Sequence, residues 1–132
     1  MKKFFYVTFA VLMISACGQT SSSDTEVVIE TVPVEYFGLT NPLGADAAEG
    51  GAVTFKSTCA SCHGEEGRGD GVASASLNPP PKNLAELQTQ VGDDYLFWKI
   101  SDGSIGTAMV PWRGILTEEQ IWELVAFVQT LK

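Results

Sequence analysis

The sequence has 132 residues, which is enough for one small domain. Its 16 Asp and Glu residues outnumber its 8 Lys and Arg residues, and the cations form no cluster. This charge pattern argues against nucleic acid as a partner, because phosphate contacts need grouped cations. Apolar residues make up 45% of the chain and aromatic residues 10%, which excludes a wholly disordered protein. Its 3 cysteines are too few, and odd in number, for a disulfide framework.

The N-terminal residues have the features of an export signal. A short cationic start, Met1-Lys2-Lys3, precedes an uncharged and mostly apolar run over residues 4–16. This run is too short to span a bilayer and is typical of a signal peptide. It ends in Ile14-Ser15-Ala16-Cys17, which resembles the lipobox of bacterial lipoproteins. We therefore predict a signal peptide at residues 1–16 and a lipidated Cys17, which anchors an exported protein at the periplasmic or outer side of the cytoplasmic membrane. The alternative is an ordinary signal peptide that contains a cysteine by chance.

Residues 17–43 are predicted to form the lipidated cysteine and a tether. Residues 20–24 are a Ser/Thr run that is typical of a flexible spacer. Residues 26–37 combine β-branched residues, acids and Pro33, which favours an extended segment and disfavours a central strand. A plain linker and an extended strap on the surface of the domain both fit this pattern.

The central motif is Cys59-Ala60-Ser61-Cys62-His63. Structural zinc normally needs four ligands, but His63 is the only histidine of the chain and Cys17 is assigned to lipid. A thioredoxin-type dithiol needs a βαβ context, which the flanking sequence lacks. The remaining interpretation is one covalently attached haem c, with thioether bonds at Cys59 and Cys62 and with His63 as the proximal iron ligand.

The expected sixth ligand of the iron is Met109. Met1 and Met13 lie in the predicted leader, so Met109 is the only methionine of the mature chain. It lies in a Gly-rich loop, residues 103–112, and Pro111 follows closely. A methionine that fills a core gap more often lies on a helix face. The loop position therefore favours a side chain directed at a metal.

Over residues 44–132 these motifs resemble those of the class I monohaem c-type cytochromes, here in a bacterial lipoprotein form. The shared motifs are Gly51-x-x-x-Phe55-x-x-x-Cys59, Cys59-x-x-Cys62-His63-Gly64, the Pro79-Pro80-Pro81 loop, Met109 and a C-terminal helix. The methionine of that family is usually followed directly by proline, whereas Val110 intervenes here. The resemblance implies an all-α cytochrome c fold, in which three to four helices wrap around a covalently bound haem and the N- and C-terminal helices cross.

Local patterns predict three helices. Asp46-Ala47-Ala48-Glu49 reads as a capping box that opens a helix to about Cys59. Asp93 or Asp94 opens a second helix, which Gly103 ends. Thr117-Glu118-Glu119-Gln120 is a second capping box. It precedes apolar residues at helical spacing, namely Ile121, Leu124, Val125 and Val128.

The resemblance also implies how other residues serve the cofactor. The first and last helices cross near Gly51, with core residues packed around it, namely Phe55, Leu124 and Phe127. The long irregular stretch between His63 and Asp93 wraps the porphyrin, and the carbonyl of Pro80 or Pro79 accepts a hydrogen bond from Nδ1 of His63. Candidates for hydrogen bonds to the haem propionates, with packing or an exposed turn as the alternative, are Tyr95, Trp98, Trp112 and Arg68.

The predicted ligand pair favours electron transfer over catalysis. A haem held by His63 and Met109 has no open coordination position, so it exchanges single electrons through its exposed edge. The function expected is transfer between respiratory or photosynthetic redox partners, as a tethered carrier or as a subunit of a membrane oxidoreductase complex. The acidic composition favours a partner with a basic docking surface. The alternative is a haem-based gas or redox sensor, or a haem enzyme, with a labile sixth ligand.

Overall fold

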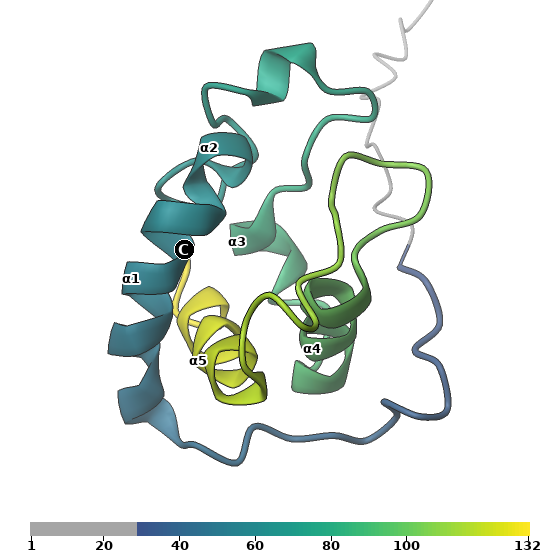
Figure 1. Ribbon diagram of the computed structural model, residues 1–132, viewed down its shortest axis with the longest axis vertical. Coiled ribbons are helices and arrows are strands. Elements are labelled where there is room, and N and C mark those ends of the chain that lie inside the picture. Colours follow the sequence, from purple (N-terminus) through teal and green to yellow (C-terminus); the bar gives the residue numbers. More distant parts are fainter. Residues whose placement is uncertain (1–28) are drawn as a thin grey trace, which may run out of the picture.

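The computed structural model describes residues 29–132, so the predicted signal peptide, Cys17 and the first part of the tether lie outside the described residues. Within residues 29–132 the chain is helical and has no β-strand, which confirms the predicted all-α class (Figure 1). No helix in this part of the chain is both long and apolar enough to cross a membrane. In chain order the helices are η1 (Ala45–Ala47), α1 (Ala48–Thr58), α2 (Ala60–His63), η2 (Ser74–Ser76), α3 (Leu84–Leu87), α4 (Asp93–Asp102) and α5 (Glu118–Val128).

Helices α1 and α5 pack closely against each other, and Gly51 makes this contact possible (Figure 1). A Cβ atom on Gly51 would lie only 2.0 Å from the backbone oxygen of Glu123 and 2.8 Å from Cβ of Phe127. Next to this point Phe55 and Phe127 pack with their ring centroids 5.0 Å apart. The contact between the first and last long helices at Gly51 is therefore confirmed.

The ends of α4 and the start of α5 also agree with the sequence. Oγ1 of Thr117 accepts a hydrogen bond from the backbone nitrogen of Gln120 at 3.2 Å, and the Gln120 side chain accepts one from the Thr117 backbone at 2.9 Å. These two bonds are the predicted capping box of α5. Helix α4 begins at Asp93 and is followed by Gly103, whose φ of 73° is favourable only for glycine.

The capping box predicted for α1 is wrong. The N-cap position is Ala47, which makes no side-chain capping bond, and Asp46 lies inside the preceding 3₁₀ turn η1. This turn leads directly into the helix, and the Ala47 backbone nitrogen donates to the Gly44 carbonyl at 3.4 Å. Asp46 and Glu49 therefore contribute negative charge near the N-terminus of α1, which the helix dipole favours, but no cap.

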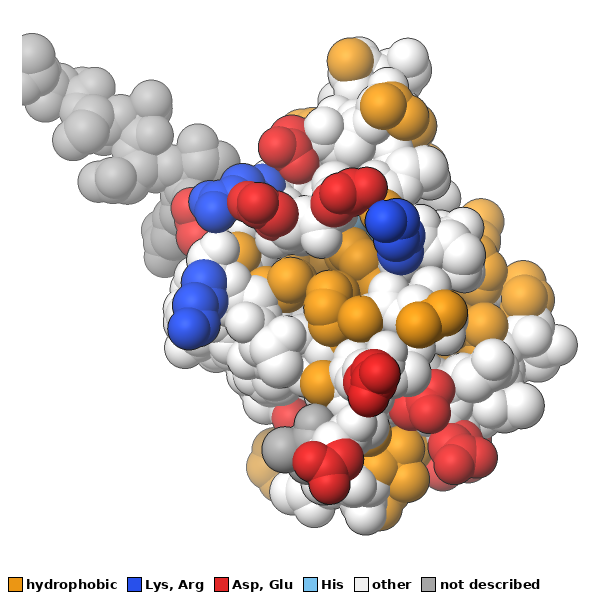
Figure 2. Space-filling model, turned by 90° about the vertical axis from the view of Figure 1, so that its left-hand side faces the viewer, with side chains coloured by type: hydrophobic (Ala, Val, Ile, Leu, Met, Phe, Trp, Pro, Cys, Tyr) orange, Lys and Arg blue, Asp and Glu red, His pale blue; other side chains and the backbone are white. Residues whose placement is uncertain are grey.

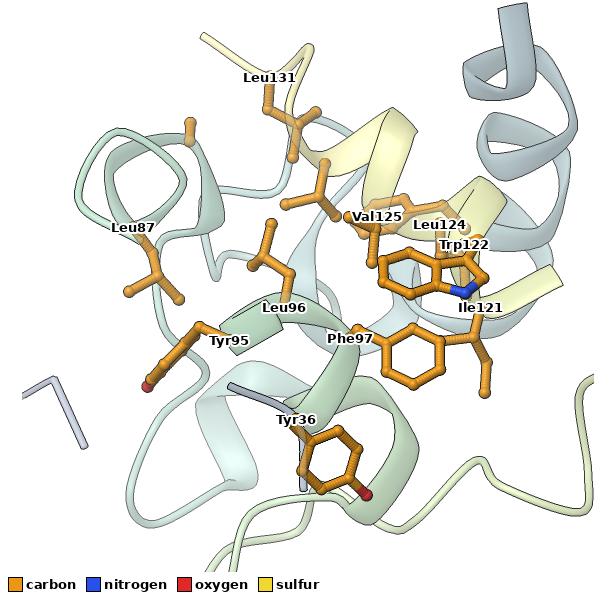
Figure 3. Packing of buried hydrophobic residues seen from close by; sticks show 13 residues of the cluster. Tyr36, Leu87, Tyr95, Leu96, Phe97, Ile121, Trp122, Leu124, Val125 and Leu131 are labelled. Atoms are coloured by element: carbon orange, nitrogen blue, oxygen red, sulfur yellow. The ribbon is translucent and has the colours of Figure 1, made fainter. Parts of the chain in front are cut away.

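The hydrophobic core is built mainly by α4 and α5 (Figure 3). Phe97 of α4 stacks on Trp122 of α5 with the ring centroids 4.0 Å apart. Leu124 and Val125, also of α5, are completely buried. Tyr36 reaches this core from an earlier part of the chain and packs against Phe97, with a centroid separation of 6.2 Å.

Residues 30–43, called the strap below, lie on α4 and α5 rather than extending away from the domain. The backbone nitrogen of Gly38 donates to Asp94 at 3.0 Å, and that of Asn41 donates to Asp93 at 2.9 Å. The Asn41 side chain donates to the backbone oxygen of Trp122 at 2.8 Å. Of the two alternatives that the sequence leaves open, the structure shows the surface strap for these residues. It is not extended throughout, because residues 34–38 form a turn in which the Tyr36 and Phe37 backbone nitrogens donate to the Pro33 carbonyl at 3.0 and 3.1 Å.

The stretch between His63 and Asp93 is mostly irregular, as expected, but contains the short helices η2 and α3. Asn83 begins α3, because its Oδ1 accepts hydrogen bonds from the backbone nitrogens of Ala85 at 3.1 Å and Glu86 at 3.3 Å. Asparagine is a favoured N-cap residue, so the sequence did carry a signal for this turn.

Candidate haem-binding site

A cavity of about 290 Å³ lies between α2, the proline loop, α4 and the loop that precedes α5. Its walls are mainly aliphatic and aromatic, as is typical of a cofactor site. The residues of the predicted site that line it are Cys59, Cys62, His63, Pro80, Met109 and Trp112. The structure therefore brings together residues that are up to 53 positions apart in the sequence, Cys59 and Trp112.

Both cysteines of the Cys-x-x-Cys-His motif lie on one tight helical turn. The backbone nitrogens of Cys62 and His63 donate to the Cys59 carbonyl at 3.1 and 2.9 Å, and all three residues line the cavity. The two cysteines are free thiols rather than a disulfide. Burial, and secondly the neighbouring Cys62, raise the pKa of the Cys59 thiol to about 11. Two thiols one helical turn apart fit attachment through two thioether bonds.

His63 has the environment expected of a neutral metal ligand. Burial lowers the pKa of its imidazole, against a smaller opposite effect of the Lys82 backbone, and a neutral imidazole is the form that binds metals. Nδ1 is buried and makes no hydrogen bond of normal geometry. The backbone of Lys82, not that of Pro80, acts on the pKa of this imidazole. Pro80 lines the cavity but is an exposed residue. The predicted hydrogen bond from Nδ1 to the carbonyl of Pro80 or Pro79 is not formed. The proline loop instead passes close to Gly69, where a Cβ atom would lie 2.5 Å from the Pro81 oxygen.

Met109 lies in the cavity wall on residues 103–112, called the Met109 loop below. The Met109 backbone nitrogen donates to Oγ1 of Thr107 at 3.1 Å, and its oxygen accepts from the Ser104 nitrogen at 3.0 Å. A Cβ atom on Gly103 would lie 2.5 Å from that same oxygen, so the loop folds tightly against the end of α4. The methionine is therefore positioned by bonds on both sides, although Val110 rather than proline follows it.

The four candidates for propionate contacts fall into two groups. Tyr95 and Trp112 line the cavity. Trp98 is not among the lining residues, and its ring instead meets the Tyr95 ring edge-on, with centroids 5.7 Å apart. Arg68 is exposed and forms an ion pair of 2.8 Å with Glu66. The geometry supports cavity roles for Tyr95 and Trp112, a packing role for Trp98 and an exposed turn at Arg68.

Lys99 is a cavity residue that the sequence motifs do not indicate. Its side chain is only 11% exposed, and Nζ lies 2.7 Å from Oε1 of Glu30 in the strap. The same ammonium group lies 3.9 Å from the centre of the Trp98 ring. The spacing of four residues from Tyr95 places both side chains on one face of α4, which is visible in the sequence. The pairing of Lys99 with Glu30 of the strap, 69 residues earlier in the chain, is not visible in the sequence.

The donor set fits a covalently bound haem better than a bare metal ion. Among residues 29–132 there is no group of three or more His, Cys, Asp or Glu side chains that would hold a metal ion. The cavity instead combines two thiols, a neutral imidazole and a thioether with a largely apolar wall. These are the groups that attach and ligate haem c.

Comparison with known proteins agrees with this chemistry. Residues 46–128 match the family model described as cytochrome c oxidase, cbb3-type, subunit III. A curated relative is the cbb3-type cytochrome c oxidase subunit FixPc of Rhizobium leguminosarum bv. viciae, which is 31% identical over 101 residues. That match covers 76% of this chain and 33% of the relative, so the chain spans about a third of the length of the relative.

Solved structures share the fold. The reducing HAO-like protein complex Kustc0457/Kustc0458 of Kuenenia stuttgartiensis has a TM-score of 0.62 at 21% identity, over 82% of this chain and 54% of that one. The KustC0563 c-type cytochrome has a TM-score of 0.54 at 25% identity, over 62% and 96%. Cytochrome cL of the marine methylotroph Methylophaga aminisulfidivorans has a TM-score of 0.51 at 24% identity, over 67% and 57%.

Together, the family match and the cavity confirm three predictions from the sequence. The chain has the all-α cytochrome c fold, it carries covalently bound haem c, and it has a role in electron transfer. Cys59 and Cys62 are in place for the attachment. The protein belongs to the family of monohaem c-type cytochrome domains described as subunit III of cbb3-type cytochrome c oxidase.

Proposed function

We propose that the protein is a membrane-anchored carrier of single electrons between respiratory or photosynthetic redox partners. The observation that carries this proposal is the presence of Cys59, Cys62, His63 and Met109 around one cavity. The cysteines would hold the haem, and His63 and Met109 would ligate its iron. When bound, the haem supplies a one-electron Fe(III)/Fe(II) couple.

The ligand arrangement accounts for transfer without catalysis. If both His63 and Met109 ligate the iron, no coordination position would remain for a substrate. The hydrogen bonds of the Met109 backbone hold this residue at the cavity wall. The apolar lining excludes water and so limits the reorganisation that accompanies each electron transfer. The Met109 sulfur favours the reduced state of the iron relative to a second histidine.

The side of the cavity formed by the Met109 loop is the proposed exit for the electron. Val110 lines the cavity and is itself 53% exposed, and Ile105 of the same loop is fully exposed. Figure 2 shows a different face, the side of α1 and α2, where acidic and a few basic side chains stand beside exposed hydrophobic ones, and the whole chain has a net charge of −8. A redox partner with a basic docking surface around an apolar contact fits this combination.

The proposed partners are membrane-bound redox complexes. The name of the family and that of its curated relative both refer to a subunit of a cbb3-type oxidase, which supports a partner of this class. A lipid on Cys17 would hold the carrier on the same membrane. Affinity capture of the tagged protein from detergent-solubilised membranes tests the partner. Recovery of an oxidoreductase complex supports it, and loss of that complex at high ionic strength supports the charged contact.

The lipid anchor is tested by the Cys17→Ala variant. Because Cys17 is separate from Cys59 and Cys62, the variant should keep its covalent haem while moving from the membrane fraction to the soluble fraction. Mass spectrometry of the wild type should show the added lipid. A variant that still sediments with membranes would contradict anchoring by this lipid.

Carbon monoxide distinguishes a carrier from a sensor or a haem enzyme. The purified holoprotein should contain one haem by mass and show a reversible one-electron couple in a redox titration. Addition of carbon monoxide to the reduced protein should leave its absorption spectrum unchanged, because Met109 occupies the sixth position. Prompt binding would overturn the carrier proposal in favour of the sensor or enzyme.

A further inference from the structure

Two polar side chains of α4 face the cavity one helical turn apart. Tyr95 and Lys99 both line it, and their spacing of four residues places them on the same helix face. The chain has 16 acidic residues, yet no Asp or Glu is found among the described residues that line the cavity. The lining does include Lys82 and Lys99. The charge of the wall is therefore opposite in sign to that of the whole chain, which suits a ligand with negative groups.

Lys99 is the less exposed of these two cations. Its side chain is 11% exposed, and a buried ammonium group is costly unless it is paired. The strap supplies the pairing, because Oε1 of Glu30 lies 2.7 Å from Nζ. Glu30 also acts on Tyr95: after burial, which raises the pKa of the Tyr95 hydroxyl group most, the Glu30 charge raises that pKa further and the Glu30 backbone lowers it. Both donors of α4 therefore meet the same strap residue at the cavity wall.

Glu30 is an exchangeable partner in this arrangement. Its carboxylate side chain is 51% exposed, so it can move into water once another anionic group pairs with Lys99. Tyr95 and Lys99 are far more firmly placed, because Tyr95 is only 2% exposed and the Lys99 ammonium lies 3.9 Å from the Trp98 ring centre. Figure 3 shows the Tyr95 ring directed away from Trp122, with its hydroxyl oxygen outermost. Tyr95 and Lys99 are therefore fixed in position, whereas the Glu30 carboxylate beside them is able to move.

We propose that Lys99 and Tyr95 bind a propionate carboxylate of the attached haem, and that Glu30 of the strap partly neutralises this site. The inference rests on the proposed function, since it concerns how the haem of the electron carrier is tuned. An ammonium group beside the haem stabilises the reduced state, which carries one positive charge less than the oxidised state. Lys99 should therefore raise the reduction potential, and Glu30 should lower it.

Redox titration of four holoprotein variants at one pH and ionic strength tests the charges. Lys99→Gln should lower the reduction potential, Lys99→Arg should leave it close to the wild-type value, and Glu30→Gln should raise it. The matched control is Lys56→Gln, an exposed lysine of α1 that does not line the cavity and should change little. Because Glu30 is half-exposed, its variant keeps the experiment decisive even if Lys99→Gln folds poorly.

Infrared difference spectra of oxidation and reduction test the propionate itself. With ¹³C-labelled propionates, the carboxylate band of the wild type should shift in Lys99→Gln and in Tyr95→Phe but not in Lys56→Gln. An unchanged band and an unchanged potential in Lys99→Gln, with only its stability reduced, would overturn the inference and leave Lys99 a packing residue. A wild type without a reversible one-electron couple would instead contradict the proposed function, so the two failures are distinguishable.

Discussion

The hydroxyl group of Tyr36 in the strap donates a hydrogen bond to Oδ2 of Asp102 at the end of α4, at 2.5 Å. Arg113 completes the cluster, because its guanidinium donates to the Tyr36 oxygen and forms an ion pair of 3.2 Å with Asp102. Asp102 immediately precedes the Met109 loop and Arg113 immediately follows it. The strap therefore joins the two ends of the loop that carries the proposed sixth ligand.

Tyr36→Phe tests how much this hydroxyl group contributes. The ring is 5% exposed and stays in place, while the hydrogen bonds that its hydroxyl group makes with Asp102 and Arg113 are lost. We expect the free energy of unfolding of the holoprotein to fall by about 1–2 kcal/mol, because Asp102 and Arg113 still pair with each other. Denaturant titration measures it. The control is Phe37→Ala, at a neighbouring ring that is 76% exposed, where the change should be within about 0.5 kcal/mol.

The same residue gives a prediction for alkaline pH. Burial, followed by the hydrogen bond to Asp102 and its charge, raises the pKa of Tyr36 above its usual value of 10.0. The unfolded phenol loses its proton near pH 10, while the folded one keeps it to higher pH. The resulting stabilisation is present below about pH 10 and is lost as the pH rises through the folded pKa. Wild-type stability should therefore approach that of Tyr36→Phe in unfolding titrations from about pH 8 to about pH 11. A difference in stability between the wild type and Tyr36→Phe that grows with rising pH would contradict the raised pKa of Tyr36.

Much of the site is predictable from local spacing. Two cysteines and a histidine within five residues fix the attachment turn, because a single helical turn brings them to one side. The capping box at Thr117 is equally local, since both of its hydrogen bonds join residues three positions apart. The helix contact at Gly51 is predicted from the family resemblance, because the local sequence does not indicate which backbone segment approaches this glycine.

The contacts that the sequence does not reveal join distant segments. Tyr36 and Asp102 are 66 residues apart, and Glu30 and Lys99 are 69 apart, so no periodicity connects them. The failure at Asp46 has a local cause. The Asp-x-x-Glu pattern fits a helix that starts at Asp46, but the 3₁₀ turn η1 moves the N-cap to Ala47. Sequence pattern alone does not separate these two starts.

Gly51→Ala should disrupt the contact between α1 and α5. The new Cβ atom would lie 2.0 Å from the backbone oxygen of Glu123, so the two helices must move apart. We expect a loss of about 1–3 kcal/mol or more in the free energy of unfolding, the range for overpacked cores. Thermal and denaturant unfolding of the holoprotein measure this loss.

Gly50→Ala is the matched control for that substitution. Its Cβ atom would lie 2.6 Å from the Glu123 carboxylate, which is the mobile end of a side chain rather than backbone. The higher helix propensity of alanine, worth about 1 kcal/mol, offsets the cost of moving that carboxylate. Similar losses at both positions would show that the close backbone approach at Gly51 is not what stabilises the contact.

Met109→Ala tests the proposed sixth ligand. If the Met109 sulfur binds the iron, oxidised wild-type protein should show a sulfur-to-iron band near the red end of the spectrum, and the variant should lack it. The variant should have a lower reduction potential, because the ligand that favours the reduced iron is gone. It should also bind carbon monoxide, since the sixth position is then open.

The rest of the site should survive the Met109 substitution. Cys59, Cys62 and His63 lie on a separate turn whose hydrogen bonds do not involve the Met109 loop, so covalent haem should persist in denaturing gels. Val110→Ala is the control, because Val110 lines the same cavity wall but offers no ligand atom, and its red band should remain. A wild type that already binds carbon monoxide, with a reduction potential that Met109→Ala leaves unchanged, would show that Met109 is not a ligand. The open position would then favour a gas sensor or a haem enzyme over a carrier.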